Sequence, residues 1–174
     1  MSMRPGLRKL ALAAHLTVSV GWVGAAAAYV ALDVVAATSR DEQALRAAFI
    51  GMGLVAGSVI VPLAVATLLT GIVMSLGTRW GLFRHWWVVI SLVLTAFAAT
   101  VLVVETGTIN AMAAAAADPS TTGGELRELG NTLVHSIGGS AVLTAILVLN
   151  VVKPRGLTPY GWRMQRRERR REPD

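Results

Sequence analysis

The sequence predicts an all-α membrane protein, a bundle of four transmembrane helices that run up, down, up and down with both termini on the cytoplasmic side. Composition is the first observation: hydrophobic residues make up 54% of the chain and charged residues only 15%, whereas soluble domains usually carry about 25% charge. The second is a set of four apolar segments, each long enough to cross a hydrocarbon core of about 30 Å as a helix. The third is the uneven placement of lysine and arginine around these segments.

The four apolar segments cover about residues 10–37, 47–76, 86–117 and 132–152, and residues 153–174 follow them as a basic tail. The first is too long for the roughly 7–15-residue apolar region of a signal peptide, so we expect it to be retained. Pro62 in the second is expected to kink the helix, because proline lacks the N–H and clashes with the preceding turn. The first three are about 30 residues, or about 45 Å of helix, so they must tilt or extend beyond the hydrocarbon on the outer side.

The basic residues indicate which side each connection faces. With a cytoplasmic N-terminus, thirteen of the sixteen lysines and arginines fall inside and three fall outside. The inside residues are Arg4, Arg8, Lys9, Arg79, Arg84 and the eight within residues 153–174, and the outside residues are Arg40, Arg46 and Arg127. Connections rich in positive charge stay in the cytoplasm. A composition rich in alanine, glycine and arginine favours a bacterial source, so we expect a multi-pass protein of the bacterial inner membrane.

The expected partners follow from the same features. The net charge is +6, but half of the basic residues lie in the tail, residues 153–174. A basic segment directly after a hydrophobic helix is typical of one that binds anionic lipid headgroups, so we expect lipid rather than nucleic acid as its partner. Small residues such as Gly53 and Gly57 allow close helix packing, within the chain, in a homo-oligomer or with another membrane protein.

Polar side chains within the spans indicate candidate sites, because a polar group in lipid needs a partner. In the first segment the polar and aromatic residues recur at spacings of three and four, which places them on one helix face. This stripe consists of His15, Ser19, Trp22, Ala26, Tyr29 and Asp33. We expect it to face the bundle interior. Counting 1.5 Å per residue from the cytoplasmic boundary, His15 and His135 differ by about 16 Å in depth, so they should not share one metal ion.

One hypothesis places a cofactor near the cytoplasmic side. His15 and His85 are expected in the same leaflet, and two histidines from different helices can clamp a b-type haem. In this interpretation the two imidazoles are axial ligands of the haem iron and Trp22 lies beside the cofactor. The protein would then serve electron transfer, sensing or assembly. The alternative is that each histidine only forms hydrogen bonds to a neighbouring helix.

A second polar cluster is expected near the outer face, formed by His135, Glu105, Tyr29 and Asp33. Chains of carboxylates and histidines form proton relays in membrane proteins. This cluster therefore favours a small transporter or proton-conducting protein, and a third interpretation is a structural subunit of a larger membrane complex. The sequence has no phosphate-cradling loop, zinc signature or nucleophile elbow, so soluble-type enzyme chemistry is not favoured.

Three motifs carry a resemblance to known proteins. They are His15-x6-Trp22-x-Gly24, Trp80-Gly81-Leu82-Phe83-Arg84-His85, and the stretch from Lys153 to Trp162 (KPRGLTPYGW). Together they resemble small four-helix bacterial proteins grouped as predicted integral membrane proteins of unknown function, which implies the same architecture over nearly the whole chain. The histidine–tryptophan pattern of the first segment also resembles an early helix of the membrane-bound haem-containing protoporphyrinogen oxidases.

Overall fold

The predicted all-α, four-span bundle is confirmed. A computed structural model describes residues 3–78 and 80–170, so Arg79 and the last four residues of the tail lie outside the described residues. Within this part, four helices are long and apolar enough to cross a membrane, namely Pro5–Thr38, Glu42–Gly77, Trp86–Ala117 and Leu133–Val152. Each begins and ends within five residues of its predicted segment. The chain is therefore a multi-pass membrane protein.

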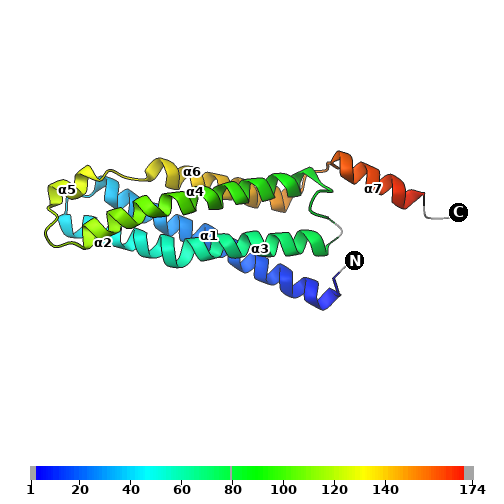
Figure 1. Ribbon diagram of the computed structural model, residues 1–174, viewed down its shortest axis with the longest axis horizontal. Helices are drawn as coiled ribbons and strands as arrows, with labels where there is room; N and C mark the ends of the chain where they lie inside the picture. Colours follow the sequence, from blue (N-terminus) through cyan, green and yellow to red (C-terminus); the bar gives the residue numbers. More distant parts are fainter. Residues whose placement is uncertain (1–2, 79, 171–174) are drawn as a thin grey trace.

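The helices form an elongated antiparallel bundle (Figure 1). Helix α1 (Pro5–Thr38) packs against α6 (Leu133–Val152) on one side and on the other against α2 (Glu42–Val55) and α3 (Val61–Gly77), which together form the second span. Helix α4 (Trp86–Ala117) packs against the same two neighbours from the opposite side. Among the described residues α1 and α4 lie across the ring from each other without close backbone approach.

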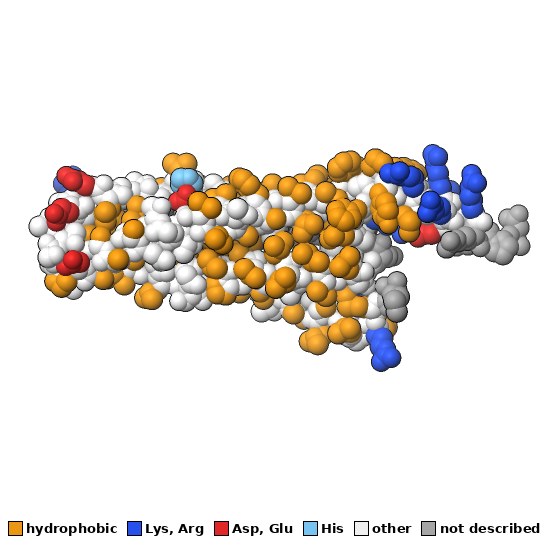
Figure 2. Space-filling view, in the orientation of Figure 1, with side chains coloured by type: hydrophobic (Ala, Val, Ile, Leu, Met, Phe, Trp, Pro, Cys, Tyr) orange, Lys and Arg blue, Asp and Glu red, His pale blue; other side chains and the backbone are white. Residues whose placement is uncertain are grey.

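The two ends of the bundle differ in charge. Both termini and the α3–α4 connection lie at one end, here called the basic end, which comprises residues 3–9, 78–85 and 153–170 (Figure 1). The other end, here called the acidic end, comprises residues 39–46 and 118–132 and includes the short helix α5 (Gly123–Glu128). Figure 2 shows arginine and lysine side chains gathered at the first end and carboxylates at the second. The separation of charge matches the pattern in the sequence.

Pro62 lies beside a distortion of the second span, as predicted, but the distortion is a widened helical turn and not a simple kink. Residues Ala56–Ile60 form a π-helical turn between α2 and α3, and Pro62 lies in the first turn of α3. The N–H of Val61 donates to the Ala56 carbonyl, five residues earlier. Because proline offers no N–H, a wider turn beside it redistributes the remaining backbone hydrogen bonds.

Packing differs along the bundle. The largest fully buried side chains, Phe49, Leu45, Met52, Leu126 and Asp33, all belong to its acidic half. Exposed large apolar side chains on α4 begin at Trp86 and end at Val104, a distance of about 27 Å. That length matches a hydrocarbon core of about 30 Å. The last part of α4 continues beyond these exposed side chains and joins a compact core, whereas on α1 the exposed large apolar side chains run from Leu7 to Val35, about 42 Å.

The tail is not a loose segment where the structure describes it. Residues Pro159–Arg169 form a helix, α7, whose N-cap Thr158 accepts a hydrogen bond from Gly161 N–H. The Thr158 backbone N–H donates to the Arg84 carbonyl at 3.1 Å, and Arg84 forms two hydrogen bonds with the Glu168 carboxylate at 3.1 and 2.8 Å. The backbone around Gly156 and Leu157 also bonds to the residues at the start of α4. The tail is thereby fixed to the α3–α4 connection.

Candidate polar sites in the spanning helices

Asp33 is the most enclosed polar residue of the first span, with no exposed surface. Its carboxylate accepts hydrogen bonds from the Thr132 backbone N–H at 3.2 Å, the Thr132 hydroxyl at 2.8 Å and the Ser136 hydroxyl at 2.7 Å. Thr132 is the N-cap of α6, and the N-terminus of a helix carries partial positive charge. The start of α6 therefore supplies the positive partner of this carboxylate.

Tyr29 belongs to the same network. Its hydroxyl lies 3.0 Å from the Thr132 hydroxyl, and the Tyr29 side chain is buried. The structure thus brings Tyr29 and Asp33 to one site, through two residues that the sequence pattern did not identify as part of it. A threonine and a serine at the first turn of a helix are common capping residues, and nothing in the sequence links them to a carboxylate about 100 positions earlier.

His135 and Glu105 form a separate pair. The His135 Nε2 and Glu105 Oε1 atoms are 4.0 Å apart, and the two side chains are 60% and 26% exposed. No hydrogen bond among the described residues joins this pair to Asp33. The predicted outer cluster thus comprises a buried network between α1 and α6 and a more exposed pair between α4 and α6, with Glu105 near enough to Tyr29 to interact with it electrostatically.

His15 has a well-defined partner on α3. Its Nδ1 atom is 2.9 Å from the Thr70 hydroxyl, which donates its own hydrogen to the Ala66 carbonyl at 2.7 Å. In the tautomer that donates from Nδ1–H to this oxygen, the neutral ring has its lone pair on Nε2. Gly71 allows this approach: a Cβ at that position would lie 3.3 Å from His15 Cε1.

His85 lies at the basic end in a different setting. Its Nδ1 is 2.8 Å from the Trp80 carbonyl oxygen, which can only accept, so Nδ1–H donates here too. The ring also meets the Trp80 indole edge-on, with centroids 5.2 Å apart, and faces Trp87 at 6.5 Å. The His85 backbone forms a bridge with Leu157.

The structure does not bring His15 and His85 together. Thr70, the partner of His15, precedes the end of α3 at Gly77 by seven residues, or about 10 Å. Neither ring contacts nor hydrogen bonds join the two histidines within the described residues. Trp22, assigned beside a cofactor, instead lies in the hydrophobic core with 4% of its surface exposed. The assignment of the two histidines as the axial pair of one haem stays a prediction.

Several buried hydroxyls have no hydrogen-bond partner among the described residues. Their oxygens are fully enclosed, and they belong to Ser19 on α1, Thr67 on α3, Ser91 on α4 and Ser140 on α6. Thr67 and Ser91 are each 8% exposed. An unsatisfied hydroxyl in an apolar interior costs about 1–3 kcal/mol. Each spanning helix therefore directs one such group into the bundle, and only Ser19 was part of a predicted polar stripe.

An apolar layer separates the polar groups. Trp22 lies one turn beyond Ser19 on α1, and Ile60 and Leu143 contribute from the second and fourth spans. These three side chains are 4%, 5% and 8% exposed. The polar residues on the basic side of the layer are His15 and the hydroxyls near it, and those on the acidic side are Ser140, Tyr29, Asp33 and the partners of the last two.

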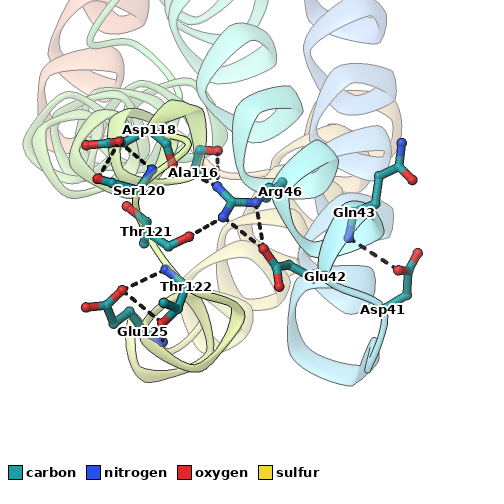
Figure 3. Close-up of polar contacts among 10 residues, drawn as sticks. All are labelled: Asp41, Glu42, Gln43, Arg46, Ala116, Asp118, Ser120, Thr121, Thr122 and Glu125. Atoms are coloured by element: carbon teal, nitrogen blue, oxygen red, sulfur yellow. Dashed lines mark hydrogen bonds and ion pairs between the residues drawn. The ribbon is translucent and has the colours of Figure 1, made fainter.

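Arg46 connects the segments of the acidic end. The charge pattern of the sequence identified it only as one of the three basic residues on the outer side. Its guanidinium donates to the carbonyls of Ala116, Asp118 and Thr121 and pairs with Glu42 at 2.9 Å (Figure 3). These carbonyls end α4 and begin the following connection, so one side chain ties α2 to both. Arg46 is 21% exposed.

Caps stabilise the helix starts around it (Figure 3). The Asp41 carboxylate accepts from the backbone N–H groups of Gln43 and Ala44 at the start of α2. Thr122 and Glu125 form a reciprocal capping box on α5. Hydrogen bonds from the Thr122 backbone and hydroxyl hold the pKa of Glu125 below its usual value, and those from Ser120 do the same for the pKa of Asp118.

Comparison with protein-family models, with curated proteins and with solved structures found no match for this chain.

Proposed function

We propose that this chain is a small proton-conducting transporter of the bacterial inner membrane, with both termini in the cytoplasm. The observation that carries the proposal is the division of its interior polar groups into two sets by an apolar layer. His15 and its hydroxyl neighbours lie on one side of Trp22, and Tyr29 and Asp33 lie on the other. A polar pathway interrupted by an apolar constriction is a usual design for gated conduction.

The groups on each side have the chemistry that proton transfer needs. In the tautomer that donates from Nδ1–H, His15 has a lone pair on Nε2 that can accept a proton. On the other side Glu105 lies 4.0 Å from His135, within reach of one bridging water. Histidines and carboxylates within membrane helices commonly serve as proton-relay groups. The buried Asp33 holds the start of α6 in position beside that pair.

The charge distribution supports the orientation in this proposal. Lysine and arginine gather at the basic end (Figure 2), and such segments stay in the cytoplasm. Four arginines of α7 form no side-chain hydrogen bond or ion pair within the described residues: Arg166, Arg167, Arg169 and Arg170. They suit the anionic headgroups of the cytoplasmic leaflet, to which the basic end lies closest.

Proton flux in proteoliposomes tests the function. The purified chain, reconstituted with a pH-sensitive dye inside, should conduct protons down an imposed gradient. Replacing His15 by Ala, or Glu105 by Gln, should lower the flux by about 100-fold, the scale on which loss of one proton-transfer group acts. His85→Ala is the control for loss of an imidazole, because this ring bonds to the Trp80 carbonyl and no hydrogen bond within the described residues joins it to His15.

Replacing Trp22 by Ala should raise the flux, because it removes the largest side chain of the apolar layer. Flux no greater than that of protein-free liposomes, with native helix content retained, would overturn the proposal. So would flux that His15→Ala and Glu105→Gln both leave unchanged.

A further inference from the structure

The unpartnered hydroxyls on the basic side of the apolar layer lie on helix faces that meet. Ser19 follows His15 by one turn on α1, and Thr67 precedes Thr70 by one turn on α3. Since His15 and Thr70 are hydrogen-bonded and the helices are antiparallel, Ser19 and Thr67 face each other one turn deeper. Neither oxygen has a partner in the described structure.

Helix α4 extends this set toward the basic end. Its inward face carries Trp87, Ser91 and Thr95, each 8% exposed or less. Ser91 lies five residues, or about 8 Å, from the start of α4 at Trp86. His15 and Thr67 lie about 10 and 15 Å from the same end, counted along α3. The hydroxyls and the imidazole therefore form a ladder between the end of the bundle and the apolar layer.

Helix α1 is weakly packed where this ladder begins, although Met3 N–H donates to the Gly77 carbonyl at 3.2 Å and ties the residues before α1 to the end of α3. Nearly every residue in the range 5–14 of α1 is exposed, and Figure 1 shows this part of α1 diverging from the other helices toward the basic end. No charged side chain occurs between Lys9 and Asp33 in α1, in α3, or before Glu105 in α4. A species that enters here meets hydroxyls and one imidazole.

We propose that a chain of water molecules occupies the interior between α1, α3 and α4, from the basic end to Ser19 and Thr67, and delivers hydrated protons to the His15 imidazole. Each orphan hydroxyl then gains a hydrogen-bond partner that the protein itself does not supply. Water both donates and accepts and is the smallest such species, which suits neutral groups spaced along a narrow interior. This inference rests on the proposed function, and it specifies hydrated protons as the species that the transporter moves.

Cysteine labelling tests the water chain without measuring flux. The chain contains no cysteine, so Ser19→Cys, Thr67→Cys and Ser91→Cys each introduce a single thiol of nearly the same size. A thiol that contacts water ionises and reacts with a small cationic methanethiosulfonate, whereas a thiol in hydrocarbon stays protonated. Leu69→Cys and Val93→Cys are the controls, since these side chains are 57% and 59% exposed on the lipid-facing surface of the same helices.

In proteoliposomes, with the reagent on both sides, the three interior variants should react about tenfold faster or more than the two controls. Reaction no faster than the controls would overturn the water chain. Solid-state NMR transfer of magnetisation from water to the serine and threonine side chains of the unsubstituted chain gives a second reading, in which absence of transfer to Thr67 and Ser91 would also overturn it. Rapid labelling without proton flux would overturn the proposed function alone.

Discussion

A buried carboxylate that pairs with no basic side chain among the described residues is the central feature at the scale of single residues. Asp33 has no exposed surface, and its three donors come from the first residues of α6. Charge-assisted hydrogen bonds of this kind contribute about 1.5–3 kcal/mol each. Asp33 therefore fixes the position of the start of α6 against α1. The few buried residues of α6 do not fix this position by packing.

Asp33→Ala should lower the free energy of unfolding in mixed micelles by about 3 kcal/mol, because it removes the acceptor and leaves buried donors unpaired. Asp33→Asn should cost less, since one oxygen remains to accept. Asp41→Ala is the control: its carboxylate caps α2 at an exposed position, where loss of the cap costs about 1 kcal/mol. Equal losses for Asp33→Ala and Asp41→Ala would contradict the role assigned to Asp33.

The limits of sequence reasoning are also clear at single residues. The stripe from His15 to Asp33 could be recognised because helical spacing is written along one segment. Its partners Thr70, Thr132 and Ser136 come from other helices, and which helix faces them depends on rotation and register that no periodicity encodes. The same limit applies to His15 and His85: a shared leaflet motivated their pairing, and that pairing stays a prediction.

At the scale of secondary-structure elements, contacts between helices distinguish residues that look alike in the sequence, as the second span shows. Gly53 and Gly57 form a GxxxG pattern that predicts close packing for both. A Cβ at Gly53 would lie 2.7 Å from the Ala113 Cβ of α4, whereas a Cβ at Gly57 meets nothing within 4 Å. Only the first glycine is needed for the approach of α2 to α4.

Gly53→Ala should therefore destabilise the chain by about 1–3 kcal/mol, the usual cost of overpacking. Gly57→Ala should be neutral or slightly stabilising, because alanine orders a helix better than glycine by about 1 kcal/mol. The free energy of unfolding in the same mixed micelles measures both effects. Each variant adds one methyl group to the native chain, so the two substitutions are matched. A larger loss for Gly57→Ala than for Gly53→Ala would contradict the α2–α4 contact.

The sequence predicted whole helices better than it predicted contacts between single residues. Length and hydropathy predicted all four spans, because a membrane requires about 20 apolar residues whatever the packing. Helices α5 and α7 were not predicted. Both are short, and they are held by caps and by contacts with distant connections, such as Thr158 with the Arg84 carbonyl, that composition does not reveal.

For the whole molecule, charge and apolar surface together define how the bundle lies in a bilayer. The apolar belt of α4 ends at Val104, and thirteen further residues continue to Ala117. These residues join α2 and α5 around a core that includes Phe49 and Leu126, which are 1% and 0% exposed. Such close burial is typical of a core surrounded by water, where the hydrophobic effect operates.

Labelling in intact cells tests this placement. With the basic end in the cytoplasm, Ala114→Cys, at an exposed position on the projecting part of α4, should react with an impermeant maleimide added outside. Gln165→Cys on α7 should react only after the membrane is permeabilised, and Val93→Cys on the apolar belt should react in neither case. The reverse order for the two end positions would invert the orientation. Protection of Ala114→Cys on both sides would instead show that the hydrocarbon covers the whole of α4, since its 32 residues would then have to tilt to fit about 30 Å.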